Sequence, residues 1–212
     1  IGNRRFMPGY RALSAAIADG TIGTPMHFEG SFCGSFGYGY SNDIWRGSSE
    51  ENPAGGMAAM GIHVLDAMIA AMGPVRRVST LSRRLALTCS LDDTTSVQME
   101  FASGATGTLS TLMATASYWR LHIFGSKGWT QMPEENRCVV TELDTAPHEA
   151  SFDPVDSVAE ELTCFADAVR GGSAYPVTGA QALAGVAAME AIARSAQAGG
   201  DWVEVAEVYA RG

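Results

Sequence analysis

Apolar and polar positions along the chain are spaced in patterns that predict its first elements. Residues 8–19 carry apolar side chains at helical spacing between Pro8 and Gly20, which predicts a helix. Residues 26–32 alternate apolar and polar side chains with a period of two, which predicts a strand. Residues 34–53 are rich in Gly, Ser, Tyr and Asn and predict a long loop.

The rest of the chain predicts a second helix, a run of strands and two more helices. Residues 57–72 predict a helix that ends at Gly73-Pro74. Strands are predicted at 75–87, 94–101, 105–115 and 119–124, with a weaker one at 138–143. An amphipathic helix is predicted at residues 154–169 and an alanine-rich helix at residues 177–198. A last short strand is predicted at residues 202–205.

This order of elements predicts an α+β fold with an open, mostly antiparallel sheet and helices packed on one face. Short turns such as Ser103-Gly104 join successive strands, which favours antiparallel pairing. We expect residues 1–212 to form a single domain. Strand 94–101 alternates polar with apolar side chains, so the second face of the sheet is partly polar. Such a flat face predicts a subunit contact and a homo-oligomer.

Composition and charge exclude several classes of protein. The chain has 212 residues, of which 46% are hydrophobic and 17% charged, as in an ordinary globular protein. Its net charge of -9 argues against a nucleic-acid partner, which requires clustered Lys and Arg. No segment predicts a membrane span or a secretory signal. Four cysteines without a CxxC pair predict reduced thiols in a cytoplasmic protein and no metal site.

The most informative segment for chemistry is 55–66, which carries one histidine, His63. Small residues around Gly55-Gly56 leave room for a molecule to lie against the start of the helix. An imidazole is the side chain that exchanges a proton most readily near neutral pH. The segment therefore predicts a substrate site with an acid/base group. A close helix–sheet contact with a hydrogen-bonded core histidine is the alternative interpretation.

Several further motifs occur in an order that matches one known family. They are Asn3-Arg4-Arg5-Phe6-Met7-Pro8 with Gly20-Thr21-Ile22-Gly23, Trp45-Arg46 with Gly55-Gly56 and Gly61–Asp66, Phe101–Gly107, Ile123–Gly128, and Val177-Thr178-Gly179 with Glu190–Ala196. Together they span almost the whole chain. The sequence resembles the C-terminal, substrate-binding domain of the Gfo/Idh/MocA family of NAD(P)-dependent sugar and polyol oxidoreductases.

The resemblance implies hydride transfer between NAD or NADP and a secondary alcohol of a sugar, inositol or related polyol. His63 takes the position of the family's catalytic histidine, which removes the hydroxyl proton. The resemblance also implies a substrate pocket and a cofactor contact near the domain junction. The substrate-binding candidates are Trp45, Arg46 and Tyr118, and the cofactor-binding candidates are Arg4 and Arg5.

Two departures from the family pattern matter. Many members carry an aspartate four residues before the histidine, where this chain has Ala59; Asp66 is three residues after His63 and is a speculative replacement. The chain also lacks a GxGxxG after a strand and the family's catalytic lysine stretch, and Lys127 is a poor substitute. We therefore expect the N-terminal dinucleotide-binding domain to be missing and the isolated chain to be inactive.

Two other functions are alternatives to the oxidoreductase. A stand-alone, non-catalytic carbohydrate-binding or oligomerisation module explains the loss of the carboxylate at Ala59 and of the cofactor motifs. A metal-dependent hydrolase that uses His63, Asp66, His27 and His122 is disfavoured, because the histidines show no HxxxH or HxH spacing.

Overall fold

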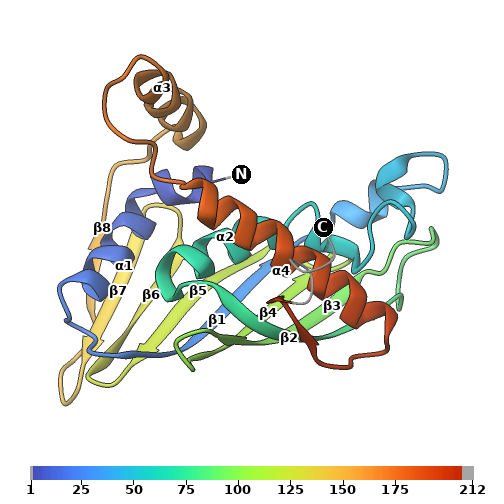
Figure 1. The fold of residues 1–212 in the computed structure, drawn as a ribbon, viewed down its shortest axis with the longest axis horizontal. Coiled ribbons are helices and arrows are strands. Elements are labelled where there is room, and N and C mark those ends of the chain that lie inside the picture. Colours follow the sequence, from blue (N-terminus) through green and yellow to red (C-terminus); the bar gives the residue numbers. More distant parts are fainter. Residues whose placement is uncertain (1, 207–212) are drawn as a thin grey trace.

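A nine-stranded sheet forms the frame of the structure, a computed structural model that describes residues 2–206 (Figure 1). The strands follow one another across the sheet in the order β8-β7-β6-β5-β1-β4-β3-β2-β9. Their bounds are β1 Pro25–Cys33, β2 Val75–Arg83, β3 Thr94–Phe101, β4 Thr106–Leu112, β5 Tyr118–Gly125, β6 Gly128–Glu134, β7 Arg137–Glu142, β8 His148–Ser151 and β9 Val203–Glu204.

All neighbouring strands pair antiparallel except β1 and β4, which are parallel. β1 lies in the middle of the sheet, with Phe28 opposite Gly107 of β4 and Ile123 of β5. The first strand in sequence thus separates two groups of strands that follow it. The predicted open, mostly antiparallel sheet is confirmed.

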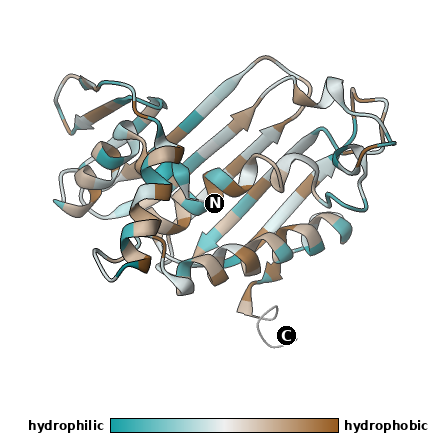
Figure 2. Ribbon diagram, turned by 90° about the horizontal axis from the view of Figure 1, so that it is seen from above, coloured by the Kyte–Doolittle hydropathy of each residue, from teal (hydrophilic) through white to brown (hydrophobic). Residues whose placement is uncertain are grey.

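Three helices cover one face of this sheet. α1 (Pro8–Ala18) packs on β6 and β7, α2 (Gly61–Met72) on β1 and β4, and α4 (Gly179–Gln197) on β2 and α2. Figure 2 shows these helices on one side of the strands, along which hydrophobic and hydrophilic residues alternate. This arrangement confirms the predicted α+β class. α3 (Ser157–Val169) instead stands beyond the end of the sheet.

The core lies between α2 and the central strands. Val64 and Met68 of α2 are fully buried against the strands, as are Phe28 and Leu109. α2 approaches β1 closely because Gly30 has no side chain: a Cβ there would lie 2.4 Å from Val64 Cγ1. A glycine in the middle of β1 therefore sets the height of α2 above the sheet.

The helix expected at 57–72 begins four residues later, at Gly61. Ala54 and Gly55 have positive φ values of 63° and 58°, and residues Gly55–Met57 form a 3-10 turn. This left-handed backbone interrupts the helical path, so the glycine pair belongs to a turn that leads into α2. The start expected from the apolar run was wrong.

Two predicted strands are shorter in the structure, and two strands were missed. β2 ends at Arg83 because the Asp93 carboxylate accepts hydrogen bonds from the amides of Leu85, Ala86 and Leu87, which turns the chain out of the sheet. β4 ends at Leu112. The missed strands are β6, which mixes polar residues with a proline, and the four-residue edge strand β8, which is mostly exposed.

The other elements follow the sequence patterns closely. α1, β1, β3, β5, β7, α4 and β9 lie within two residues of their predicted bounds. α3 begins at Ser157, where the Asp156 side chain caps the amides of Val158 and Ala159. Within residues 2–206, no helix combines the length and the apolar character needed to cross a membrane.

Candidate active site around His63

His63 lies in the first turn of α2, where its amide donates a hydrogen bond to the Met60 carbonyl at 3.1 Å. The side chain is half-buried, and among the described residues its buried Nδ1 has no hydrogen-bond partner. Burial lowers the pKa of His63, and the positive charge of Arg4 lowers it further. Both effects favour the neutral imidazole, which is the form able to accept a proton.

The Arg4 guanidinium packs against two aromatic rings. Its guanidinium carbon lies 4.8 Å from the Trp119 ring centroid and 5.4 Å from that of Phe32, which are cation–π contacts. The two rings meet edge to face at 5.2 Å because Phe32 and Trp119 are paired residues of β1 and β5. Glu135 accepts a hydrogen bond of 2.6 Å from Arg4 Nη1. The ends of β1 and β5 thus hold the positive charge that acts on His63.

Four buried polar atoms here have no hydrogen-bond partner among the described residues: Asn3 Oδ1, Arg4 Nε, His63 Nδ1 and Trp119 Nε1. Buried polar groups in folded proteins are nearly always paired. Two of these atoms are obligate donors and one an obligate acceptor. These four atoms therefore lack the pairing that buried polar groups ordinarily have.

Arg5 and Asp66 form a buried ion pair next to the site. Arg5 Nε and Nη2 donate to the two Asp66 carboxylate oxygens at 2.9 and 2.7 Å, and both side chains are 7% exposed. Arg5 Nη1 donates to Gln181 Oε1 at 2.8 Å. The described hydrogen bonds of the Asp66 carboxylate go to Arg5, and its charge acts on His63 to oppose the lowering of the His63 pKa. That Asp66 replaces the family aspartate stays a prediction.

The same contacts give Arg5 a structural role. Its guanidinium joins the N-terminal segment to α2 and α4, which is a structural use of the side chain. Of the two arginines predicted at the domain junction, Arg4 acts on the charge of His63, and Arg5 pairs with Asp66. Ala59 lies in the exposed turn before α2, so no carboxylate stands one turn before the histidine.

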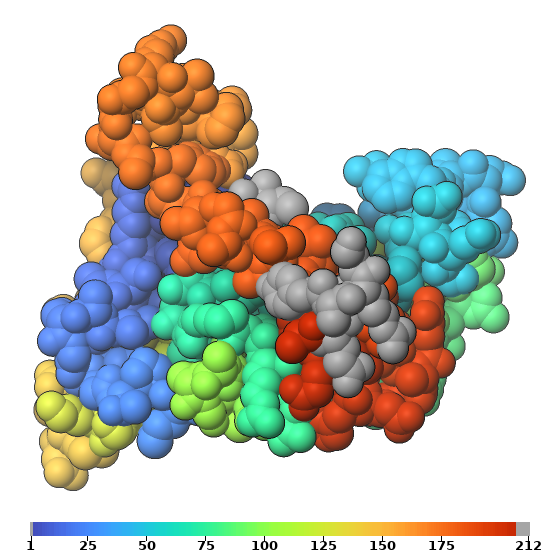
Figure 3. Space-filling view, viewed as in Figure 1, coloured from blue at the N-terminus to red at the C-terminus, as the bar shows by residue number. Residues whose placement is uncertain are grey.

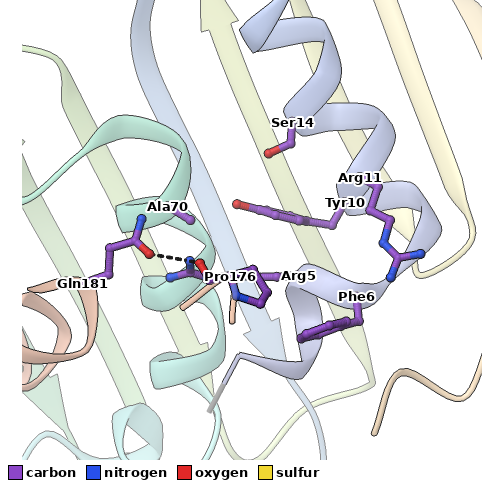
Figure 4. Close-up of a pocket in the computed structure, with 8 residues that line it drawn as sticks. All are labelled: Arg5, Phe6, Tyr10, Arg11, Ser14, Ala70, Pro176 and Gln181. Atoms are coloured by element: carbon purple, nitrogen blue, oxygen red, sulfur yellow. Dashed lines mark hydrogen bonds between the residues drawn. The ribbon is translucent and has the colours of Figure 1, made fainter. Parts of the chain in front are cut away.

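A cleft of about 470 Å³ opens between α1, α2 and the start of α4 (Figure 4). Figure 4 shows Arg5 and Gln181 joined on one side of it and Tyr10 and Ser14 of α1 on the other. The Tyr10 hydroxyl donates to the Ala67 carbonyl, and burial raises its pKa to about 12. His63 does not line this cleft, so the cleft is separate from the candidate active site.

The structure does not bring the three predicted substrate-binding residues to His63. Trp45 is 57% exposed and stacks with Arg46 at 4.6 Å, in a loop that projects from the body at the end opposite α3 (Figure 3). Tyr118 is 52% exposed, and strand alternation places it on the face of β5 opposite Trp119. Trp119 is the aromatic residue at the site.

No group of three or more metal-ligating side chains occurs within the described residues. His27 Nδ1 contacts Thr106 Oγ1 at 2.7 Å, and His122 stacks on Phe124 on the face away from the helices. The four residues considered for a metal-dependent hydrolase are thus distributed over both faces of the sheet.

Comparison with known proteins agrees with this architecture. Residues 10–131 match the profile of the GFO/IDH/MocA C-terminal domain. The chain belongs to the GFO/IDH/MocA family. No curated protein sequence matches it closely enough to count as a relative.

Solved structures share the fold at low sequence identity. A putative NADPH-dependent oxidoreductase from Desulfitobacterium hafniense DCB-2 has a TM-score of 0.87 and 22% identity over 96% of this chain and 63% of its own. An NAD binding oxidoreductase from Klebsiella pneumoniae has a TM-score of 0.85 and 20% identity over 97% of this chain and 65% of its own. Levoglucosan dehydrogenase, solved with NADH and L-sorbose, has a TM-score of 0.80 and 19% identity over 98% of this chain and 66% of its own. The chain therefore spans less than two thirds of each of these relatives.

Sequence reasoning placed His63 and Arg4 in the site but missed Asn3, Phe32 and Trp119. Phe32 and Trp119 are ordinary apolar positions of strands, and only the β1–β5 register brings them together. The one sequence signal is that both stand at the ends of their strands, where side chains reach the edge of a sheet.

Proposed function

We propose that this chain is the substrate-binding domain of an NAD(P)-dependent oxidoreductase that acts at a secondary alcohol of a sugar, inositol or related polyol. The observation that carries the proposal is the neutral, half-buried His63, whose Nδ1 has no partner within the described residues. Such a group suits the removal of a hydroxyl proton. The unpaired donors and acceptors around it suit a molecule with several hydroxyl groups.

In the oxidation, His63 holds the proton that leaves the substrate hydroxyl. Arg4 opposes protonation of His63 beforehand and orients a bound hydroxyl through its Nε–H. Trp119 provides an apolar surface beneath the sugar ring and an indole N–H at its edge. NAD or NADP, when bound, supplies the carbon that accepts the hydride.

This chain contributes little to holding the dinucleotide. Its glycine-spaced segment at 34–40 uses its amides internally: Gly34 and Gly37 donate to the carbonyls of Leu112 and Met113. These amides are not free to cradle phosphates. We therefore assign the dinucleotide to a separate binding domain, with contacts from Arg4, and treat residues 1–212 as one substrate-binding domain. The residues that select NAD or NADP lie in that other domain.

A non-catalytic carbohydrate-binding or oligomerisation module is the second candidate. It is favoured by one observation, the absence of a carboxylate partner for His63, since Ala59 has none and Arg5 engages Asp66. This candidate keeps the site around Trp119 for ligand binding but assigns no proton transfer to His63.

All four cysteines are free, which supports the proposed cytoplasmic location for either candidate.

The decisive experiment measures dehydrogenase activity of the complete gene product with NAD⁺ and NADP⁺ on a panel of sugars, inositols and polyols. We expect His63→Ala to lower kcat by at least about a hundredfold without changing the Kd of the dinucleotide. In the wild type, oxidation should fall as the pH drops through the pKa of His63, which burial and Arg4 lower from its ordinary value, because the protonated ring cannot accept a proton.

His148→Ala is the matched control, because His148 is exposed in the edge strand β8. It should retain wild-type turnover. Near-normal kcat in His63→Ala would remove His63 as the base. Saturable sugar binding without turnover by the wild type would favour the binding module.

A further inference from the structure

Phe36 is a large aromatic side chain that stays 49% exposed in the loop between β1 and α2. The backbone just before it is fixed to the end of β4. The Gly34 amide donates to the Leu112 carbonyl at 2.9 Å, and the Gly34 carbonyl accepts from the Thr115 amide at 3.1 Å. The ring is therefore exposed at a defined place, next to the end of β1.

The Phe36 ring folds back over Gly34 because that residue has no side chain. A Cβ at Gly34 would lie 2.3 Å from Phe36 Cε2 and 2.7 Å from Phe36 Cδ2. In this position the Phe36 ring meets the Phe32 ring edge to face, with 6.3 Å between their centroids. Phe32 meets Trp119 in turn at 5.2 Å. Trp119, Phe32 and Phe36 thus form a continuous aromatic row.

Within this aromatic row, Phe36 is the ring with an open surface. The Arg4 guanidinium carbon lies 4.8 Å from the centroid of Trp119 and 5.4 Å from that of Phe32, and both of these residues are partly buried. Single exposed apolar residues are ordinary, but an exposed ring that continues a row beside a candidate site marks a contact surface. Phe36 is therefore placed to contact a bound molecule.

The aromatic row begins under the first turn of α2. A Cβ at Gly61, the first residue of α2, would lie 3.1 Å from Thr111 Cγ2, and Thr111 pairs with Phe32 across β4 and β1. His63 belongs to the same turn of α2, and the charge of Arg4 acts on it. The row therefore leads from the candidate active site to the loop after β1.

We propose that Phe36 forms a second subsite, which binds a ring joined to the sugar ring that reacts at His63. This inference rests on the proposed function and narrows its substrate class to glycosides that carry a second ring. Both a sugar ring and an aromatic ring bury apolar surface when they lie on an aromatic side chain. Because the Phe32 ring stands between Trp119 and Phe36, we expect the second ring, not the reacting one, to lie on Phe36.

The test compares four substrates of the complete gene product: a monosaccharide that the wild type oxidises, and its methyl, phenyl and glucosyl glycosides. We expect kcat/KM to be at least about tenfold higher for the phenyl or the glucosyl glycoside than for the methyl glycoside, which has no second ring. The better of the two shows whether the second ring is aromatic or a sugar. Phe36→Ala should raise KM for this glycoside about tenfold and change kcat, and KM for the monosaccharide, less than about twofold.

Three further variants separate the ring of Phe36 from the loop that carries it. Phe36→Trp keeps an aromatic face and should retain the preference. Gly34→Ala keeps Phe36 but displaces its ring, so it should raise KM for the same glycoside. Tyr38→Ala is the matched control: Tyr38 is 65% exposed in the same loop and is not part of the aromatic row, so KM for all four substrates should stay unchanged.

Equal kcat/KM for the methyl glycoside and both ring-bearing glycosides would overturn the subsite. A Phe36→Ala variant that weakens all four substrates alike would overturn it too, because the side chain would then serve the fold and not the second ring. Either result includes turnover, so the proposed function stands. A gene product that oxidises none of the sugars with NAD⁺ or NADP⁺ overturns the proposed function, and the subsite with it.

Discussion

At the scale of single residues, the Arg5–Asp66 pair shows a charged group near the candidate active site in a structural role. Both side chains are 7% exposed, and two parallel hydrogen bonds join them. A buried ion pair of this kind contributes little compared with a well-packed apolar pair, but breaking one half leaves an uncompensated charge. The consequence is that the two residues depend on each other.

We therefore expect Arg5→Ala to lower the free energy of unfolding by about 3–5 kcal/mol. Arg5→Met combined with Asp66→Leu should recover most of this loss, because no buried charge remains. Urea denaturation followed by circular dichroism measures both. Arg76→Ala is the control: Arg76 pairs with Glu100, but its side chain is 56% exposed, so the loss should stay below about 1 kcal/mol. Equal losses for Arg5→Ala and Arg76→Ala would contradict this account.

At the scale of elements, the contact between α2 and β1 depends on one missing side chain. We expect Gly30→Ala to destabilise the fold by about 1–3 kcal/mol, because its Cβ would lie 2.4 Å from Val64 Cγ1 in a filled core. Thermal unfolding measures the effect. Gly39→Ala is the control, since no atom lies within 4 Å of a Cβ there. A Gly30→Ala variant as stable as Gly39→Ala would show that α2 is free to shift.

At the scale of the whole molecule, the face of the sheet opposite the helices has no cover from the described residues. Glu29 and Arg120 form an ion pair on it, and His122 stacks on Phe124 at 4.0 Å and meets Trp129 at 4.9 Å. His122 Nε2 is buried and has no partner within the described residues. Aromatic side chains are enriched in protein interfaces, so this uncovered face is a candidate contact surface.

We propose that two copies of the chain associate through this face. Light scattering after size exclusion should give at least twice the monomer mass at micromolar concentration. Trp129→Glu should return the protein to a monomer, because it introduces a charge at the centre of the contact. Leu85→Glu, which lies on an exposed loop, should leave the mass unchanged. A wild-type monomer, or an oligomer that persists in Trp129→Glu, would rule this face out.

Local patterns predicted most of the fold. A period of two specified β1 and β3, and helical spacing with glycine or proline at the ends specified α1 and α4, because these signals depend on neighbours in sequence. The same reasoning failed at Gly55, where a left-handed backbone precedes the helix, and at β6, whose polar composition hides a strand that its neighbours stabilise.

The residue types of segment 55–66 were enough to propose His63 as an acid/base group, and its catalytic role stays a prediction. Only the tertiary structure decided which groups surround it. Arg4 packs on Trp119 and Phe32 because β1 and β5 bring these two rings together, and Arg5 pairs with Asp66 across 61 positions of the sequence. Such outcomes follow from long-range pairing, which no local pattern encodes.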